Sequence, residues 1–378
     1  MRKKRKGMRQ ARQVRYAAVG LGHIAQVALL PAFTHAGSNS QLTGLVSGDP
    51  KKLKTLSQRY GVPHAYSYEQ YEQCLREGHI DAVYIALPNS MHCDYMIYCE
   101  GWYPCPVRKA MAVTERECRQ MVSAAERART KLMIAYRLHL EEANVNVVEL
   151  ARSGKLGKLR MFNATFSMHV RKGDIRLKRA MGGGSLYDIG IYCINAARYL
   201  FQENPIEVST FSVKGTDRRF REVDEMSGAL LCFPDGKLAS FLWSFGAADV
   251  SSYELVGTKG HLQLNPAFEY VGSLTQRLTL HGHTRTKRFL AGDQFAAELI
   301  DFSDCIRRNK DPEPSGTEGL IDVQIIEALY RSSEQRKPIK LKLPAKGSWP
   351  TKRQVIRRPP VHKPSLVHTQ SPSQQLRA

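Results

Sequence analysis

The fold of this chain is indicated most clearly by one stretch near its start, Val14-Arg-Tyr-Ala-Ala-Val-Gly20-Leu-Gly22-His-Ile-Ala25. Residues 14–18 are typical of a short strand, two glycines interrupt it, and a helical pattern follows. In such a strand–turn–helix, Gly20 permits the tight turn, Gly22 lets backbone approach a pyrophosphate, and Ala25 allows close helix packing. The run predicts a dinucleotide site at the start of a helix, formed by Gly20, Leu21, Gly22, His23 and Ile24.

Strands and helices alternate through the first third of the chain. Residues 42–46 and 80–87 are further strand patterns, a helical pattern covers 115–129, and residues 131–136 are again strand-like. This alternation is typical of a parallel, doubly wound sheet. We therefore predict a Rossmann domain over residues 14–137.

The second part of the chain has a different pattern. Several strand-like runs separated by turn signals lie between residues 206 and 290, after a helix that ends near residue 201, and helical patterns follow at 294–308 and 317–334. The pattern predicts an α/β domain at residues 138–343, with a mainly antiparallel sheet open on one face. The predicted fold class is thus α/β, with two domains.

Most of the charge lies at the two ends. The chain has 378 residues and a formal net charge of +21, yet residues 16–334 carry only about +2. We predict a basic tail at residues 1–13 and a basic, Pro-rich tail at 344–378, which lacks a hydrophobic period and is expected to be disordered. Such tails bind polyanions non-specifically. No recognition motif accompanies them, and no stretch has the ~18 apolar residues of a membrane helix, so neither a specific nucleic acid nor a membrane is an expected partner.

Cysteine and histidine spacing indicates neither disulfides nor metal. Eight cysteines are spread along the chain without a C-x-x-C pair, which fits free thiols in a reducing cytoplasm. The basic N-terminal run is not followed by an apolar segment, so a secretory signal is not expected. No pair of the twelve histidines has convincing ligand spacing. We predict a cytoplasmic protein without a metal site.

The end of the second strand selects the dinucleotide. The chain reads Val46-Ser47-Gly48-Asp49-Pro-Lys51-Lys52 there. NAD sites usually place an acid at the position of Ser47. A hydroxyl followed by the ammonium of Lys52 can instead hold a 2′-phosphate, so Ser47, Gly48 and Lys52 favour NADP over NAD. The alternative is a solvated helix start with Asp49 as its N-cap.

Later motifs identify a family. They are Ile80–His92 with its Leu87-Pro88-Asn89-Ser90-Met-His92, then Met111-Ala112, Tyr136-Arg137 and Gly182-Gly-Gly-Ser-Leu-Tyr-Asp188-Ile-Gly190-Ile-Tyr192. Over about residues 14–340 the chain resembles the glucose–fructose oxidoreductase/inositol dehydrogenase (Gfo/Idh/MocA) family, and its glucose–fructose oxidoreductase branch most. The resemblance implies NAD(P)-dependent hydride transfer on sugars or polyols, such as oxidation of an aldose to a lactone or the reverse carbonyl reduction. It also implies a homo-oligomer, a dimer or tetramer.

The resemblance also assigns site residues. The nicotinamide side is expected at Leu87, Pro88, Asn89, His92, Lys109 and Arg137, and the sugar side at Lys109, Arg137, Arg176, Asp188 and Tyr192. Residues 89 and 137 follow predicted strands, where doubly wound sheets bind ligands. Three alternatives remain open: His92 begins a helix without another role, Arg137 only pairs with an acid, and Arg176 belongs to a basic surface run.

The expected catalytic residues are Lys109, Tyr192 and Asp188. Asp188 and Tyr192 are four residues apart on a predicted helix and share a face, which Asn195 extends. A phenol with its ordinary pKa of ~10 is a weak base at neutral pH, and a nearby ammonium such as Lys109 favours the phenolate. We expect Tyr192 to take the hydroxyl proton as hydride leaves the sugar carbon, with Lys109 orienting and polarising. The alternative is a core tyrosine beside a structural acid.

The loop that carries Lys109 departs from the family. The family's run is Glu-Lys-Pro-Met-Ala, whereas this chain has Arg108-Lys109-Ala110-Met111-Ala112. Upstream, Cys99-Glu-Gly-Trp-Tyr-Pro-Cys-Pro-Val-Arg-Lys109 matches nothing in the family. Read one nucleotide later, codons for this peptide permit Ala-Lys-Ala-Gly-Ile-His-Val-Leu-Cys-Glu-Lys, which does match. We therefore hypothesise a compensated pair of frameshifts, which resequencing of the coding DNA tests.

Three functions are compatible with the sequence. The favoured one is an NADP-dependent sugar oxidoreductase. A second is a nucleotide- or sugar-sensing regulator on the same fold whose turnover is impaired, which the altered Lys109 loop favours. The third, a nucleic-acid-associated protein, has only the basic tails in its support.

Overall fold

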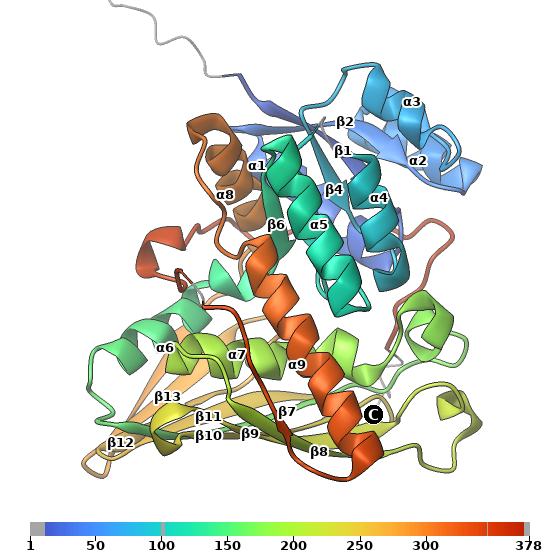
Figure 1. The fold of residues 1–378 in the computed structure, drawn as a ribbon. Coiled ribbons are helices and arrows are strands. Elements are labelled where there is room, and N and C mark those ends of the chain that lie inside the picture. The colour runs from blue at the N-terminus through green and yellow to red at the C-terminus, as the bar shows by residue number, and fades with distance from the viewer. Residues whose placement is uncertain (1–11, 100–102, 346, 374–378) are drawn as a thin grey trace, which may run out of the picture.

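The computed structural model describes residues 12–99, 103–345 and 347–373 (Figure 1). Two sheets form the scaffold, with helices packed on and between them. The predicted N-terminal tail falls mostly on residues 1–11, outside the described residues. Within the described part of the chain, no helix combines the length and apolar composition needed to cross a membrane.

The N-terminal sheet is parallel and six-stranded, in the order β3-β2-β1-β4-β5-β6. This confirms the predicted doubly wound fold. Its strands are β1 (Val14–Val19), β2 (Ser40–Val46), β3 (His64–Tyr66), β4 (Ala82–Ile85), β5 (Cys105–Arg108) and β6 (Leu132–Ala135).

Strand β1 is buried on both faces, as a central parallel strand requires. Tyr16 and Ala18 belong to the apolar cluster on one face, and Ala17 and Val19 to the cluster on the other. Helices cover both faces (Figure 1). The helices are α1 (Leu30–Ala36), which follows a π-helical turn η1 (Ala25–Leu29), α2 (Pro50–Tyr60), α3 (Tyr71–Arg76), α4 (His92–Tyr98), α5 (Glu115–Ala128), α6 (Glu142–Arg152), α7 (Ile191–Phe201), α8 (Gln294–Arg308) and α9 (Gly316–Gln335).

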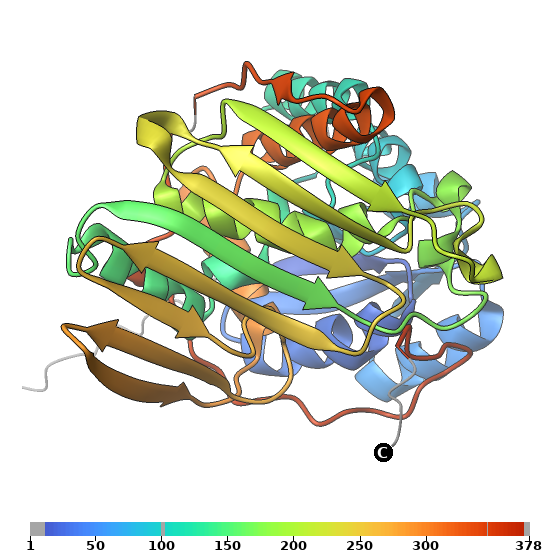
Figure 2. The same cartoon turned by 90° about the horizontal axis from the view of Figure 1, so that it is seen from below.

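The second sheet has nine strands in the order β14-β13-β12-β11-β7-β10-β9-β8-β15. All neighbours are antiparallel except β7 and β10, so the predicted mainly antiparallel sheet is confirmed. Figure 2 shows this sheet with helices on one face only. The strands are β7 (Leu159–Ser167), β8 (Glu207–Val213), β9 (Met226–Cys232), β10 (Leu238–Ser244), β11 (Val250–Gly257), β12 (Gly260–Leu264), β13 (Leu274–Leu280), β14 (His283–Phe289) and β15 (Ile339–Lys340).

Two C-terminal helices join the two sheets. Helix α8 lies in the range predicted for the second domain but packs on the N-terminal sheet, where Phe295 and Leu299 share a cluster with Tyr16. Helix α9 contacts both α5 and β8. The two predicted domains are therefore tied together over a long interface, and their bounds stay a prediction.

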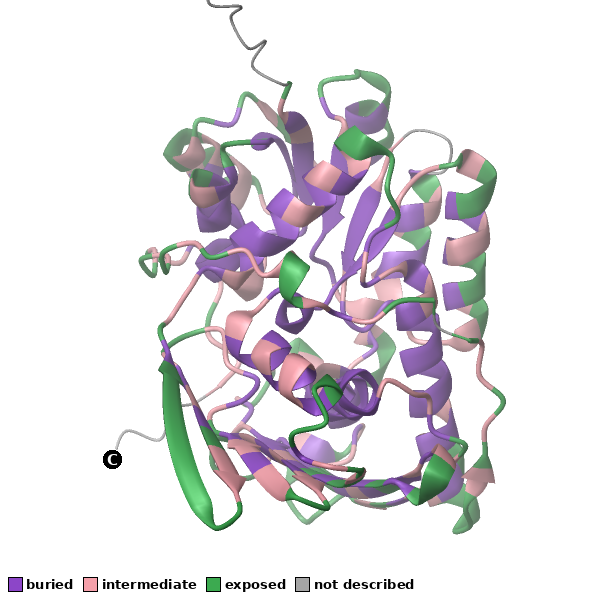
Figure 3. Cartoon of the chain, turned by 90° about the vertical axis from the view of Figure 1, so that its left-hand side faces the viewer, coloured by how far each residue is buried: buried purple, intermediate pink, exposed green. Residues whose placement is uncertain are grey.

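Two predictions about the edges of the fold differ from the structure. The sequence analysis missed β14, whose residues 283–288 are all exposed and polar, so that no apolar alternation marks them (Figure 3). The predicted disorder of the C-terminal tail is wrong for residues 347–373. Val367 there is 8% exposed and packs into the cluster of α1 and α8, held through hydrogen bonds to the buried Gln26.

A buried ionic cluster joins α7 to α9. The Arg198 guanidinium donates to Glu318 Oε1 at 3.0 Å and to Asp322 Oδ1 at 2.5 Å, and all three side chains are fully buried. Because each charge has lost its water, each depends on its partners.

We expect Arg198→Ala to lower the free energy of unfolding by about 3–5 kcal/mol, because two buried carboxylates lose their cation. Urea unfolding followed by circular dichroism measures the change. Arg119→Ala, which removes an exposed ion pair with Glu115 on α5, is the matched control and should cost less than about 1 kcal/mol. Equal losses in the two variants would contradict the importance of the buried cluster.

Candidate functional site

A cavity of ≈ 490 Å³ lies between the carboxyl end of the N-terminal sheet and the helix that carries Tyr192. This is the edge at which doubly wound sheets bind their ligands. Many of the residues that line it have ionisable or aromatic side chains. They include His23, Tyr84, Arg108, Lys109, Arg137, Arg176, Asp188, Tyr192, Asp249, Glu269 and Tyr270.

The glycine-rich turn has the geometry that the sequence predicts. Gly20 has a φ of +92°, and a Cβ there would lie 2.8 Å from the Ala86 carbonyl oxygen, so only glycine fits. At Gly22 a Cβ would meet nothing within 4 Å. The turn is thus closed toward the sheet and open toward the ligand side, which fits a dinucleotide phosphate. Leu21 is buried, and His23 and Ile24 line the cavity.

The end of β2 also fits the predicted cofactor. Ser47 is 3% exposed, and its hydroxyl oxygen accepts a hydrogen bond from Asp49 N at 3.3 Å. Asp49 caps α2 by accepting from the backbone N–H groups of Lys51 and Lys52, which confirms the N-cap alternative for this residue. No acid occupies the position of Ser47, and Lys52 lies in the first turn of α2, so the residues present suit a 2′-phosphate. Gly48 is exposed beside Tyr68.

Lys109 and Asp188 meet across the junction of the two sheets. Lys109 Nζ donates to the Asp188 backbone carbonyl and lies 3.4 Å from Asp188 Oδ1. The opposite carboxylate oxygen, Oδ2, accepts from Arg176 Nε at 2.7 Å. The Asp188 carboxylate therefore pairs with two cations that come from different segments of the chain, Lys109 and Arg176.

Burial and charge act in opposite directions on this pair. Burial lowers the pKa of Lys109, and the charge of Asp188 opposes the shift. Burial raises the pKa of Asp188, but Arg176 and Lys109 outweigh it and hold that pKa well below its ordinary value. Asp188 is thus a fixed negative charge at neutral pH.

Tyr192 lies among cations and aromatic rings. Lys109 Nζ is 4.4 Å from its ring centroid, and its hydroxyl oxygen accepts from Arg137 Nη2 at 3.1 Å. The rings of Phe166 and Phe268 lie 5.4 and 5.8 Å away, centroid to centroid. The aromatic contacts fix the ring, Lys109 lies over its face, and Arg137 bonds its oxygen.

Arg137 is more firmly fixed than the sequence analysis expected. Its side chain is buried and donates to the carbonyls of Phe268 and Glu269, to Gln294, and to Tyr192. Burial acts to lower the pKa of Arg137, but nearby oxygens outweigh it and raise it. The guanidinium therefore positions the phenol with most of its hydrogen-bonding capacity already used.

Other predicted residues occupy the surroundings of the cavity. His92 is fully buried, and its ring nitrogens bond the carbonyls of Leu87, Ala110 and Met111. These contacts tie His92 to the loop that follows Lys109, and its role beside the cofactor stays a prediction. The Lys109–Ala110 peptide bond is cis. Pro88 is partly buried and caps a short helix, and Asn89 donates to Gly182 O.

The expectation that Asn195 extends the catalytic face is wrong. Asn195 is 4% exposed and bonds His139, Glu318 and Asp322 in the buried ionic cluster. A π-helical turn, Leu186–Gly190, carries Asp188 and precedes α7. This wider turn changes the register, so Asp188 and Tyr192 face the cavity while Asn195 faces the core.

Sequence reasoning missed part of the site. Tyr270 and Glu269 line the cavity from a loop after β12 that has no motif. Glu298, on α8, does not line the cavity but lies close to it. Glu298 Oε2 accepts from the hydroxyl of Tyr84 at 3.0 Å behind the cavity wall. Burial raises the pKa of Glu298 to about 7. The available signal for Glu298 in the sequence was an acidic residue at a position that the helical pattern buries.

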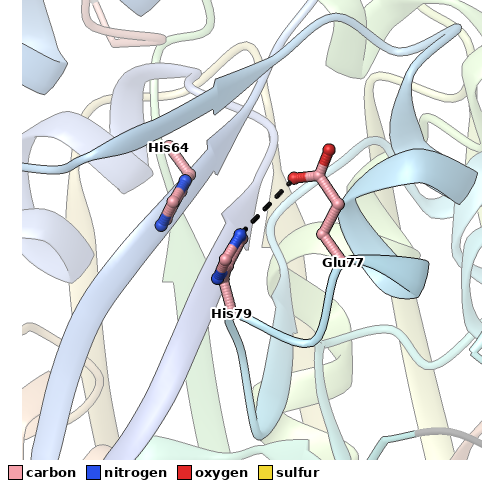
Figure 4. A group of neighbouring side chains, drawn as sticks. All are labelled: His64, Glu77 and His79. Carbon is pink, nitrogen blue, oxygen red and sulfur yellow. Dashed lines mark ion pairs between the residues drawn. The ribbon is translucent and has the colours of Figure 1, made fainter.

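The spacing of the histidines along the chain did not reveal one group of neighbouring side chains, formed by His64, Glu77 and His79. His64 and His79 stack at 4.0 Å with an interplanar angle of 3°, and Glu77 Oε2 lies 3.8 Å from His79 Nε2 (Figure 4). Imidazole lone pairs lie in the ring plane, so two stacked rings do not direct them at one ion. Glu77 also accepts from the hydroxyl of Tyr66 at 2.5 Å. The geometry is that of a stacked, hydrogen-bonded surface group, and we assign it no metal.

Comparisons with known proteins identify the family. An oxidoreductase family with an NAD-binding Rossmann fold matches residues 14–136, and the Gfo/Idh/MocA C-terminal domain matches residues 145–263. The chain belongs to the Gfo/Idh/MocA oxidoreductase family. This confirms the predicted family, its two-part fold and the prediction of an oxidoreductase.

Three relatives show how far the similarity extends. The crystal structure of aldose–aldose oxidoreductase from Caulobacter crescentus is 35% identical with a TM-score of 0.82, and it covers 87% of this chain and 100% of that one. The D-xylose 1-dehydrogenase [NADP(+)] of Haloarcula marismortui is 29% identical over 87% of this chain and 93% of its own. The dTDP-3,4-didehydro-2,6-dideoxy-alpha-D-glucose 3-reductase of Saccharopolyspora spinosa is 30% identical over 68% and 75%, respectively.

Glu298 gives this Gfo/Idh/MocA protein a pH-dependent stability. Its pKa is about 7 in the folded chain and near 4.5 when unfolded, so the folded state binds the extra proton between these values. Stability from this group is therefore full below about pH 4.5 and is lost as the pH rises to about 7. We expect Glu298→Gln to gain about 1–3 kcal/mol relative to the parent between pH 5 and pH 8.

Urea unfolding at the two pH values measures this change. Glu334→Gln, an exposed glutamate at the end of α9, is the control and should show the parent's pH dependence. An unchanged pH profile in Glu298→Gln would show that Glu298 is already ionised at pH 5.

Proposed function

We propose that this chain is an NADP-dependent sugar oxidoreductase that moves hydride between an aldose carbon and the nicotinamide. The observation that carries the proposal is the phenol of Tyr192, held by Lys109 and Arg137 in a cavity at the carboxyl edge of the Rossmann sheet. The NADP-dependent xylose dehydrogenase and the aldose–aldose oxidoreductase among its relatives support the cofactor and the substrate class.

The residues of this chain divide the work as follows. Bound NADP supplies the hydride acceptor, held by the turn at Gly20 and Gly22, by Ser47 and Gly48, and by Lys52. Tyr192 accepts the proton of the sugar hydroxyl as hydride leaves the same carbon. Lys109 and Arg137 stabilise the oxygen charge before the proton arrives, and Asp188 holds Lys109 in place. In the reverse direction Tyr192 returns the proton to a carbonyl oxygen.

Arg176 completes the sugar side of the proposed site. It lines the cavity and pairs with Asp188 and Asp174 at 2.7 and 3.2 Å. This geometry supports a role on the sugar side rather than in a basic surface run. Arg176 and Lys109 both pair with the Asp188 carboxylate. A sugar hydroxyl that bonds this carboxylate would therefore lie beside both cations. The nicotinamide side stays a prediction for the same six residues, Leu87, Pro88, Asn89, His92, Lys109 and Arg137.

Tyr192→Phe should reduce kcat for aldose oxidation by about 10²–10⁴, because the variant removes the proton acceptor and keeps the ring. NADP binding should change little, since the hydroxyl is proposed to act on the sugar. NADPH absorbance with a panel of aldoses, together with NADP titration by fluorescence, measures both. Tyr98→Phe, an exposed tyrosine, is the control. Full activity in Tyr192→Phe would overturn the assigned role.

A second function, sensing without turnover, is favoured by the strand that precedes Lys109. Strand β5 is an interior strand, yet Pro106 within it and Pro104 directly before it have no N–H group to donate. Arg108 also adds a positive charge beside Lys109 in the cavity. The frameshifted peptide would remove both prolines and Arg108. Part of that peptide, residues 100–102, lies outside the described residues.

A chain that carries the shifted peptide at positions 99–108 separates the two functions. If the printed sequence impairs turnover, this variant should show higher kcat with similar NADP binding. Equal kcat in both chains, at a rate typical of an enzyme, would dispose of the sensing function.

We also propose that the chain forms a homo-oligomer through the open face of the nine-stranded sheet. Large apolar side chains are exposed there, among them Phe211 at 76% and Leu242 at 56%. A contiguous apolar surface of this kind is typical of an interface. The cytoplasmic location and the absence of a nucleic-acid partner stay predictions.

Leu242→Glu should convert the oligomer to a smaller species, because it places a charge at the centre of the apolar face. Light scattering coupled to size-exclusion chromatography measures the mass. Leu290→Glu, at a residue that is 85% exposed after β14, is the matched control and should keep the parent's mass. A monomeric parent chain would refute the interface.

A further inference from the structure

The C-terminal segment of residues 357–373, here called the strap, crosses from one side of the cofactor edge to the other. Figure 2 shows it in red along the outside of the N-terminal domain, turning back toward the large sheet. At its start the Arg358 carbonyl accepts from Asp293 N at 3.0 Å. At its end the Pro372 carbonyl accepts from Arg171 N at 2.8 Å, and Ser373 donates to Asp249 at 3.3 Å. Both ends are therefore fastened to elements outside the six-stranded sheet.

The middle of the strap is fastened to the two elements that flank the predicted dinucleotide. Val367 exchanges two hydrogen bonds with the Gln26 amide, at 2.8 and 2.9 Å, four residues after Gly22. His368 Nδ1 lies 3.0 Å from Asp49 Oδ2, two residues after Ser47. A dinucleotide in a Rossmann domain runs along the carboxyl edge between these two points. The strap thus lies along the cofactor's path.

The strap also forms part of the cavity wall and carries the charge that a dinucleotide requires. Pro360, Val361 and Lys363 line the cavity, as do residues 371–373. The charge of Lys363 reaches the glycine-rich turn: burial lowers the pKa of His23 to about 4, with Arg176 and Lys363 adding to the shift. The strap contains two arginines and Lys363 but no acidic residue. Cations beside the turn attract the phosphates of NADP.

The strap lies outside the two domains that the family models match. Those domains cover residues 14–136 and 145–263. The contacts of the strap therefore join residues after the second matched domain to the Rossmann domain.

We propose that the strap retains the bound cofactor: NADP can enter and leave only when residues 357–373 come away from the cofactor edge, and Lys363 contacts its phosphates. This rests on the proposed function, because it takes NADP as the occupant of the edge. The strap contributes to binding in two ways, as a cover over the bound dinucleotide and as a source of positive charge. Its effect falls on the dissociation rate, where most affinity differences between related complexes arise.

Release of NADPH tests the proposal. Full-length chain loaded with NADPH is mixed with excess NADP, and the loss of bound-NADPH fluorescence gives the dissociation rate. A chain ending at Ile356 should release NADPH about tenfold faster or more. Since truncation can affect folding, Val367→Asp, which releases the anchor and keeps the chain length, should give an increase of similar size. Thermal unfolding of each cofactor-free chain checks that it is folded.

Lys363 has its own set of variants. Lys363→Ala should speed release about three- to tenfold at low salt and less at 0.5 M salt, because screening weakens a charge contact. Lys363→Arg should restore the parent's rate. Arg353→Ala, which removes an exposed cation before the strap, should change nothing. A salt-independent effect, or an equal effect of Arg353→Ala, would overturn the role of Lys363.

The outcomes separate the two proposals. If the full chain and the truncated chain bind NADPH and release it at the same rate, the strap proposal fails and the proposed function stands. Tighter NADPH binding after truncation would show an obstructing strap and would also overturn retention. If neither chain binds NADP, the proposed function fails, and the strap proposal fails with it.

Discussion

The contact between Lys109 and Asp188 is the constraint on which the site depends. Lys109 follows β5 of the Rossmann sheet, and Asp188 lies in the π-helical turn before α7, so one buried ion pair fixes the two halves against each other. Separating them would leave a buried charge on each side. The same pair places the ammonium over the ring of Tyr192 and leaves Arg176 on the other carboxylate oxygen. This one interaction therefore contributes to both the packing of the two domains and the geometry of the site.

The sequence predicted those parts of the molecule whose signals are local. A glycine turn after a buried strand, the serine at the end of the next strand and the Asp–Tyr spacing each depend on neighbouring residues. The parallel sheet, the mainly antiparallel second sheet and the gathering of Lys109, Asp188 and Tyr192 agree with the structure. The placement of Asn195 failed because a π-helical turn shifts the register by about one residue, which no helical spacing rule includes.

Contacts between distant segments could not be predicted in this way. Arg137 was expected beside a ligand and lines the cavity, but two of its four hydrogen bonds go to loop carbonyls more than 130 residues later. The C-terminal strap was expected to be disordered because its composition cannot form a core of its own. It is held in place by hydrogen bonds to three residues of the Rossmann domain, Gln26, Asp49 and Arg59. Composition indicates whether a segment can form a core of its own, but it does not report contacts with distant parts of the chain.

Strand β5 is the place where local sequence and global fold disagree. The parallel sheet needs an interior strand between β4 and β6, and the chain provides Cys105–Arg108, of which only Val107 pairs with β4. Pro106 removes a donor at the centre of that strand, whereas the leucine that the shifted peptide carries at the same position would supply one. Natural sequences rarely combine such a conflict with otherwise consistent signals on both flanks. Because β5 leads directly into Lys109, which pairs with Asp188 and lies over the ring of Tyr192, this conflict falls on the segment that positions the site.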